Sequence, residues 1–317
     1  MQLHPGLFVS RCLMSVSHGQ QRKLYAELID ILNAGGDFDH ARACAEFAVS
    51  QGLWRYAFQR PLQYFDTLPL VTQFDRRKLW VVSYLEKHAP EIRAELERIS
   101  HPEAVGFKPV EESLVDRGRW DQVVFYEGGR RFKQVEKHFP ALAGILERIP
   151  PEHRNAGVIM LSWLHPGAHI AGHCGYTNGR LRIHLGLKIP PGARMRVHDT
   201  ELTWRAGECL VFDDSIEHEV WNDGSEPRVI LLFDIFHPGL PASDRQALAQ
   251  REDESAPVRR FMKDRGFRNL ALTRDGEVTV ALDRATELFV QRYLVDSGIA
   301  SIELSADDEL RTEPAAN

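Results

Sequence analysis

Histidine, the side chain that most often binds metals, is concentrated in one part of this sequence. The chain has 14 histidines, and seven of them fall between residues 165 and 237. They are His165, His169, His173, His184, His198, His218 and His237. An isolated histidine is usually a surface residue or a hydrogen-bonded core residue, but a cluster of this density predicts a metal site.

A basic strand lies in the same region. Residues 180–189, RLRIHLGLKI, alternate strictly, with leucine or isoleucine at every second position and Arg180, Arg182 and His184 on the opposite face. Such a face can be solvated on the outside of a sheet, or it can line a cavity that holds an anion, because buried cations need a counter-charge. The strand alone leaves both interpretations open.

Three residues around this strand have a spacing that indicates iron chemistry. His173 precedes the strand, His218 lies in a later turn, and Arg228 follows ten residues after His218. The pattern resembles that of Fe(II)- and 2-oxoglutarate-dependent oxygenases, in which two histidines bind iron and the arginine binds the far carboxylate of 2-oxoglutarate. Guanidinium suits a carboxylate because it pairs bidentately and keeps its charge. The usual acid two residues after the first histidine is missing, since that position is Gly175.

Other ligand sets are possible near the same residues. Carboxylates close to His218 could replace the missing acid, although an Asp-Asp pair at a strand end is more often a turn or cap; these are Asp213, Asp214 and Glu217. Residues 165–173 contain an H-x3-H-x3-H pattern, which on a helix would favour zinc. Pro166 and Gly167 argue against a helix there, so we expect a loop in which only His173 binds metal.

Two long segments resemble the aspartyl/asparaginyl β-hydroxylase family: HPGAHIAGHCGYTNGRLRIHLGLKIPPG and TWRAGECLVFDDSIEHEVWNDGSEPRVILLFDIFHP. Upstream, RPLQYFDTLP and residues 114–131, LVDRGRWDQVVFYEGGRR, extend the resemblance, which covers about residues 53–240. This family binds iron with two histidines and has a glycine where the acid would be, which accounts for Gly175.

The resemblance implies a role for nine residues. Six would hold iron and cosubstrate: His173 and His218 for Fe(II), Ser162 and Arg228 for the distal carboxylate of 2-oxoglutarate, and Arg182 and His184 for its chelating end. Three would contact the substrate: Trp120, Gln122 and Arg180. One position departs from the better-known animal members, because Val115 stands where they carry an arginine, and Arg117 or Arg119 could compensate.

The resemblance also implies the reaction. A 2-oxoglutarate-dependent dioxygenase of this family would use O2 to hydroxylate the β-carbon of an Asp or Asn residue in a peptide or protein, and would release succinate and CO2. The same chemistry on a small-molecule, carrier-bound or lipid-linked acceptor stays open. From another class, a non-catalytic jelly roll could sense a dicarboxylate or bind metal structurally, but the chain keeps every part that an enzyme needs. A zinc hydrolase is disfavoured because no HExxH motif is present.

The composition of the chain limits which partners it could bind and in which compartment it could act. The 317 residues carry a net charge of −6, which argues against a general binder of nucleic acid or anionic membranes. We read no transmembrane stretch and no signal peptide. The four cysteines form no CxxC pair, so we expect a reducing cytoplasmic setting. The sequence leaves the oligomeric state open.

The hydrophobic pattern predicts an α+β chain in three parts. Residues 1–52 form a helical lead-in, a repeat-like helix pair whose stripes are Leu24, Leu28, Ile31 and Leu32, then Ala41, Cys44, Ala45, Phe47 and Ala48. Residues 53–240 form a double-stranded β-helix, the jelly-roll or cupin-like core, with an aromatic segment at 53–70 and a helix at 76–100 broken near Pro90. Residues 241–317 hold a linker, a small α/β appendage and a disordered tail. The appendage could be a lid, an oligomer contact, a partner site or a structural buttress.

Overall fold

The structure is a computed structural model that describes residues 17–34, 36–110, 114–249, 270–273, 299–304 and 310–314. The chain separates into two compact units, residues 1–250 and 251–317. Within these described ranges, no helix combines the length and the apolar character needed to cross a membrane.

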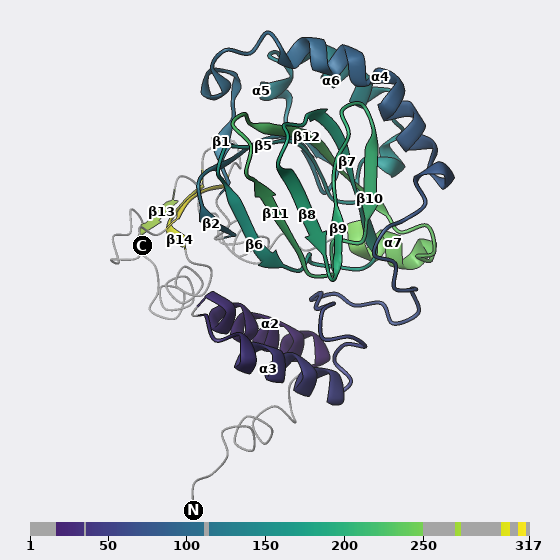
Figure 1. The fold of residues 1–317 in the computed structure, drawn as a ribbon, viewed down its shortest axis with the longest axis vertical. Coiled ribbons are helices and arrows are strands. Elements are labelled where there is room, and N and C mark those ends of the chain that lie inside the picture. The colour runs from purple at the N-terminus through teal and green to yellow at the C-terminus, as the bar shows by residue number, and fades with distance from the viewer. Residues whose placement is uncertain are drawn as a thin grey trace, which may run out of the picture. The chain divides into compact units, whose positions relative to one another are not determined.

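Two antiparallel sheets form the centre of the first unit (Figure 1). The larger sheet runs in the order β1 (Lys108–Pro109), β3 (Trp120–Glu127), β5 (Val158–Leu164), β12 (Arg228–Phe236), β7 (Arg180–Lys188) and β10 (Cys209–Phe212), with β4 (Arg130–Arg131) paired to β3. The smaller sheet runs β2 (Val115–Arg117), β6 (His169–His173), β11 (His218–Asn222), β8 (Ala193–Val197) and β9 (Thr200–Leu202). From β5 to β12 the chain passes repeatedly between the sheets. This is the double-stranded β-helix that the sequence predicts.

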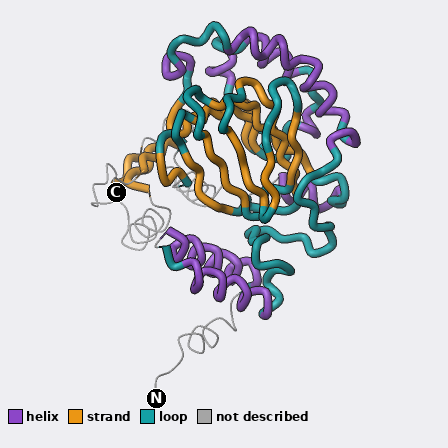
Figure 2. Tube along the Cα trace, in the orientation of Figure 1, coloured by secondary structure: helices purple, strands orange, loops and turns teal. Residues whose placement is uncertain are grey.

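Helices cover one face of the larger sheet, and this decides which way the basic face of β7 points. In Figure 2 the helices of this part of the chain lie along one side of the strands. The leucines and isoleucine of β7 pack in one cluster with apolar residues of α4 (Trp80–Leu96) and α6 (Pro140–Glu147). Alternation then turns Arg182 and His184 to the interior between the two sheets. His184 is 5% exposed, so the solvated interpretation of the basic face is wrong.

The long helix differs from the expected one at its proline. Pro90 predicts a break, yet α4 runs continuously from Trp80 to Leu96. Leu85 and Ile92, on either side of the proline, are fully buried. Their packing holds the helix together across the hydrogen bond that proline cannot make.

The predicted helix pair forms as α2 (His18–Ala34) and α3 (Phe38–Ser50), but the buried stripe of α2 is shifted by one residue. Tyr25 and Ile29 are buried, whereas Leu24 and Leu28 are 49% and 39% exposed. Tyr25 packs against the ring of Phe47, with ring centroids 6.3 Å apart. Small residues of α3 let the helices approach closely, so the aromatic residue takes the interior position; they are Ala41, Ala45 and Ala48.

An extended segment, residues 56–65, joins this helix pair to the sheets, and we call it the strap. Just before the strap, Trp54 is buried against the helix pair, and its indole N–H donates to the carbonyl of Pro61. Further along, Gln59 pairs with Ile216 and Gln63 pairs with Thr177 as isolated β-bridges. The strap therefore pairs with the loop before β11 and the loop after β6, which are the loops next to the two candidate histidines.

The remaining elements are short. They are η2 (Arg76–Lys78), η3 (Pro102–Val105), α5 (Lys133–Glu136), η4 (Pro151–His153) and α7 (Ala242–Ala249). In the second unit β13 (Leu270–Thr273), β14 (Ile299–Leu304) and β15 (Leu310–Pro314) form an antiparallel sheet. These strands agree with the β part of the small α/β appendage expected within residues 241–317, and residues 250–269 and 274–298 lie outside the described ranges. The prediction of a disordered tail is wrong at 310–314, because β15 pairs with β14.

Candidate functional site

The two candidate metal histidines lie side by side in the smaller sheet. His173 ends β6, His218 begins β11, and the two residues are cross-strand partners. Their ring centroids are 4.2 Å apart. In each ring Nδ1 lies close to a backbone carbonyl, 2.8 Å from Ala171 O and 2.9 Å from Ile216 O. A carbonyl only accepts hydrogen bonds, so both Nδ1 atoms carry the proton and both Nε2 atoms keep a lone pair for a metal.

Burial keeps both imidazoles neutral. It lowers the pKa of His173 to about 4, and it lowers the pKa of His218 well below the usual histidine value. Neutral imidazole is the form that binds metal, so this pair needs no deprotonation near pH 7.

Among the residues that the structure describes, no third protein ligand accompanies the pair. Across the described ranges, no group of three or more His, Cys, Asp and Glu side chains is placed to hold a metal ion. Glu217 is bound by Arg60 and Arg196, and Asp213 is bound by Ser215 and Gln59. These carboxylates are therefore engaged in other contacts.

Gly175 occupies the position where an acid would complete the usual triad, and the structure leaves no space for one. Its N–H donates to the carbonyl of Asp214 at 2.7 Å. A Cβ built on Gly175 would clash with the Asp214 carboxylate. An acidic side chain at 175 would thus require Asp214 to move.

An unbalanced cation lies in the same interior. Arg228 is 1% exposed, and burial lowers its pKa to about 9. Its Nε and Nη1 find no hydrogen-bond partner in the described part of the chain, and neither does Nε2 of the buried His184. Leaving buried donors unmet is costly, and most so for a charged group. The donor set fits an anion, and a carboxylate is the anion that guanidinium binds bidentately.

Ser162 lies next to this cation. It faces Ile230 on one neighbouring strand and Gln122 on the other, and Ile230 shares its face of β12 with Arg228. The indole N–H of Trp120 donates to Ser162 Oγ at 2.8 Å. The hydroxyl proton of Ser162 is then available to donate to an anion beside Arg228.

Arg182 differs from Arg228 because its charge is already balanced. Its Nε and Nη2 donate to the two oxygens of Asp234 at 2.9 and 3.1 Å, and Nη1 lies 2.9 Å from Asp214. Burial raises the pKa of Asp214 to about 6, and Arg182 limits this rise. The charge in this interior that lacks a carboxylate partner among the described residues is therefore that of Arg228.

Sequence comparisons agree with this geometry. A profile described as aspartyl/asparaginyl beta-hydroxylase matches residues 86–238. The human aspartyl/asparaginyl beta-hydroxylase is 42% identical over 144 residues, which are 45% of this chain and 19% of that protein. Residues 86–238 belong to the aspartyl/asparaginyl β-hydroxylase family.

Other relatives match the same part of the chain. Mouse aspartate beta-hydroxylase domain-containing protein 1 is 39% identical over 135 residues, covering 40% of this chain and 37% of that protein. A Pseudomonas putida prolyl-4-hydroxylase structure is 19% identical with a TM-score of 0.31, covering 47% of this chain and 86% of that one. The chain thus spans well under two thirds of the curated family relatives that it matches.

The structure does not bring together all three residues that the family resemblance assigns to the substrate. Trp120 and Gln122 lie on β3, beside Ser162. Arg180 faces Phe236, six residues along β12 from Ile230, which is about 20 Å of strand. The backbones of Gln122 and Arg180 are therefore at opposite ends of the sheet.

The two arginines that could compensate for Val115 make other contacts. Arg117 is 63% exposed and donates to the carbonyl of Gly167. Arg119 pairs with Asp121 and Glu103.

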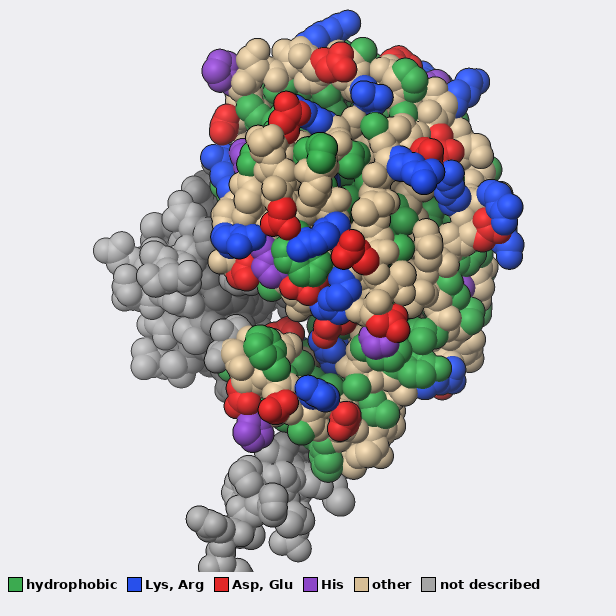
Figure 3. All heavy atoms as spheres, in the orientation of Figure 1, with side chains coloured by type: hydrophobic (Ala, Val, Ile, Leu, Met, Phe, Trp, Pro, Cys, Tyr) green, Lys and Arg blue, Asp and Glu red, His purple; other side chains and the backbone are tan. Residues whose placement is uncertain are grey.

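The exposed face of the smaller sheet carries both signs of charge (Figure 3). There Arg196 pairs with Glu217 and Glu219, while Arg194 lies over the ring of Trp221. Alternating signs of this kind are typical of a solvated sheet face.

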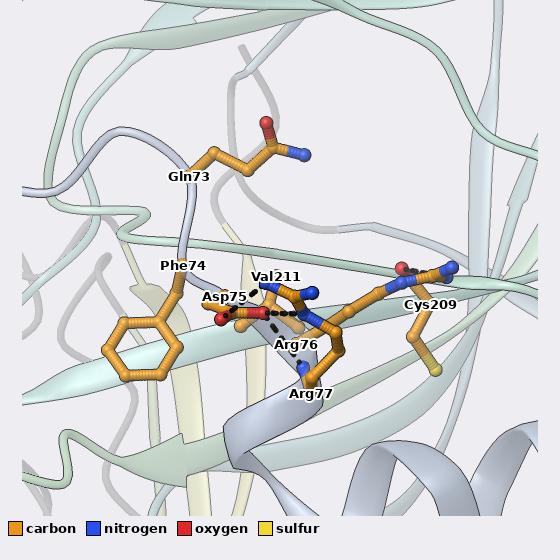
Figure 4. A pocket seen from close by; sticks show the side chains of 7 residues that line it. All are labelled: Gln73, Phe74, Asp75, Arg76, Arg77, Cys209 and Val211. Atoms are coloured by element: carbon orange, nitrogen blue, oxygen red, sulfur yellow. Dashed lines mark hydrogen bonds and ion pairs between the residues drawn. The ribbon is translucent and has the colours of Figure 1, made fainter.

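A cavity of about 310 Å³ lies away from the histidine pair, lined by Gln73, Phe74, Asp75, Arg76, Arg77, Cys209 and Val211 (Figure 4). Arg77 is paired with Asp75, and Arg76 with Glu86 and Glu208. Burial raises the pKa of the Cys209 thiol, which keeps it protonated and unreactive. We assign no chemistry to this cavity.

Sequence reasoning missed two residues that contact the site. Gln59 holds the turn before His218, and Trp204 contacts both His184 and Arg228. The segment ELTWRAGE is typical of a strand, but β9 ends at Leu202 and the chain turns at Gly207, which has a φ of 84°. A tryptophan in a short polar segment was the only available signal.

Proposed function

We propose that this chain is an Fe(II)- and 2-oxoglutarate-dependent dioxygenase. One observation carries the proposal: a neutral histidine pair shares an interior with Arg228, a buried cation without a counter-charge. The pair suits a divalent metal, and the cation suits the far end of a dicarboxylate. Family membership supports the same conclusion.

Each residue then has a defined task. His173 and His218 would hold the metal through Nε2, since their Nδ1 protons are used by backbone carbonyls. Arg228 and Ser162 would bind the distal carboxylate, and Arg182 and His184 the other end. Bound Fe(II) and 2-oxoglutarate supply the oxidation of a C–H bond by O2, with release of succinate and CO2.

Burial limits the contact of this interior with water, since His184, His218 and Arg228 are each at most 5% exposed. Side chains from both sheets pack around it, among them Phe212, whose ring lies 5.4 Å from that of His218 and 5.0 Å from that of His184. Exclusion of water strengthens every ionic contact to the cosubstrate and limits side reactions.

The proposed acceptor is the β-carbon of an Asp or Asn residue in a peptide. The names of the human and mouse relatives support this choice. Trp120, Gln122 and Arg180 are the candidate contacts. A small-molecule, carrier-bound or lipid-linked acceptor is the alternative, and succinate release with Asp- and Asn-containing peptides, against matched Ala peptides, separates the two.

The first test is an anaerobic titration with Fe(II) and 2-oxoglutarate, following the visible charge-transfer band of the chelated cosubstrate. We expect His173→Ala to abolish the band and Arg228→Ala to require about tenfold or more cosubstrate. Arg194→Ala, on the exposed face, is the matched control and should behave as the wild type. If folded, metal-loaded wild type gives no band, the protein is a sensor or structural jelly roll instead.

A further inference from the structure

One tryptophan contacts both halves of the anion site. Trp204 lies in the loop after β9 and is 5% exposed. Its indole N–H donates to Nδ1 of His184, with 3.3 Å between the nitrogens. The guanidinium carbon of Arg228 lies 4.9 Å from the centre of the Trp204 ring.

The hydrogen bond decides which nitrogen of His184 carries the proton. An indole N–H can only donate, so Nδ1 of His184 must accept. Burial lowers the pKa of His184 well below its usual value, so the ring is neutral and its proton sits on Nε2. That Nε2 is buried, and none of the described residues accepts from it. A carboxylate only accepts, so this proton position suits it, whereas a lone pair on Nε2 would repel it.

The ring face of Trp204 acts on the second group. A cation over an indole face is attracted by the negative charge on that face, and the attraction is stronger where water is excluded. Arg228 is fully buried, and two of its nitrogens find no hydrogen-bond partner in the described ranges. The indole thus holds the guanidinium in place while no anion is bound.

We propose that Trp204 is a positioning residue for the cosubstrate: its N–H fixes the proton of His184 on Nε2, and its ring orients Arg228. The inference rests on the proposed function, because it assigns His184 and Arg228 to the two ends of one dicarboxylate. The single side chain of Trp204 would then orient both His184 and Arg228 before the cosubstrate binds.

Two substitutions separate the two contacts. Trp204→Phe keeps an aromatic face under Arg228 but removes the N–H, and Trp204→Leu removes both. Trp54→Phe is the control, because Trp54 is also buried and donates its N–H to Pro61 O at 2.8 Å, but it belongs to the helix-pair core.

The experiment has two readouts. Nitrogen-15 NMR of histidine-labelled, metal-free protein reports the proton of His184, which we expect on Nε2 in the wild type and divided between both nitrogens in Trp204→Phe. Calorimetry with the Mn(II)-loaded protein measures 2-oxoglutarate binding. We expect affinity to fall roughly three- to tenfold in Trp204→Phe, to fall further in Trp204→Leu, and to stay unchanged in Trp54→Phe. Turnover at saturating 2-oxoglutarate should change less than KM.

The outcomes distinguish this inference from the proposed function. A proton on Nδ1 of His184 in the wild type overturns the inference even if no variant folds. So does wild-type affinity in a folded Trp204→Phe protein. If the wild type itself fails to bind 2-oxoglutarate, the proposed function is wrong, and the inference falls with it even when the proton lies on Nε2.

Discussion

Two arginines face the same interior, but their charges are balanced differently. Arg182 is held by Asp214 and Asp234, whereas Arg228 lies over the face of Trp204 and has no carboxylate partner among the described residues. A paired buried cation contributes to structure, and an unpaired one is ready for a ligand. The paired Arg182 therefore stabilises the site, while the unpaired Arg228 is available to bind an anion.

Replacing each arginine by methionine should therefore have opposite effects on stability. Arg182→Met leaves two buried carboxylates unpaired, so we expect the free energy of unfolding to fall by about 3 kcal/mol. Arg228→Met removes an unpaired cation, so ligand-free protein should be as stable as the wild type or more stable, while 2-oxoglutarate binding is lost. Urea unfolding without ligand, together with calorimetry, measures both. A large loss of stability in Arg228→Met would contradict this account.

The histidine pair should bind metal with little dependence on pH. The pKa of His173 is lowered to about 4, and that of His218 is also lowered, so protons begin to compete with a metal only well below the usual histidine range. We expect Mn(II) affinity to stay nearly constant from pH 8 to about 6 and to fall on further acidification. Titrations in Asp214→Asn are the control, because the pKa of Asp214 is about 6. A tenfold loss per pH unit starting near pH 6.5 would indicate ordinary histidines.

Among the elements, the strap is hydrogen-bonded to both loops that adjoin the histidines, the loop before β11 and the loop after β6. Phe58 O accepts from the N–H of Glu217, next to His218, and Gln63 N–H donates to Tyr176 O, beyond His173. Gln59 adds a side-chain contact, since its amide donates to Asp213 at 3.1 Å and to Ser215 at 3.0 Å. These bonds fix the turn whose Ile216 carbonyl orients His218.

Gln59→Leu should weaken metal binding, because it releases this turn without touching a ligand. Lost partners of this kind typically reduce metal affinity about tenfold or more. Gln63→Leu is the matched control, since Gln63 joins the other loop through its backbone. Mn(II) binding and thermal unfolding should be measured on both variants. Equal metal affinity in Gln59→Leu and Gln63→Leu would show that the amide does not position His218.

Some of these elements could be predicted from sequence, and others depend on contacts that are distant in the chain. The alternation of apolar and basic residues along β7 predicts its two faces, because a pattern of period two can be recognised within the strand itself. The burial of its basic face required α4 and α6, and the partners of Arg182 required the sheet order that brings Asp234 beside it. The stripe of α2 was misplaced because Tyr25 could fill the interior only against the small residues of α3. Trp204 could not be assigned to the site from the sequence, because the segment around it is typical of a strand.

At the scale of the whole molecule, the histidine pair, the anion-binding residues and the strap all lie in the first unit, residues 1–250. A chain that ends after residue 250 should therefore bind Fe(II) and 2-oxoglutarate as the full chain does, with a dissociation constant within about twofold. The charge-transfer titration measures this directly. Loss of binding in a folded truncated chain would give the second unit a part in the site.

The unpaired charge of Arg228 also has a consequence for the lifetime of the protein. A ligand that binds the folded state alone raises its stability in proportion to the logarithm of ligand concentration. Because a dicarboxylate supplies the missing counter-charge, the folded fraction should rise with its concentration, and degradation by proteases that attack unfolded chains should slow. The abundance of this protein would then follow the supply of its own cosubstrate.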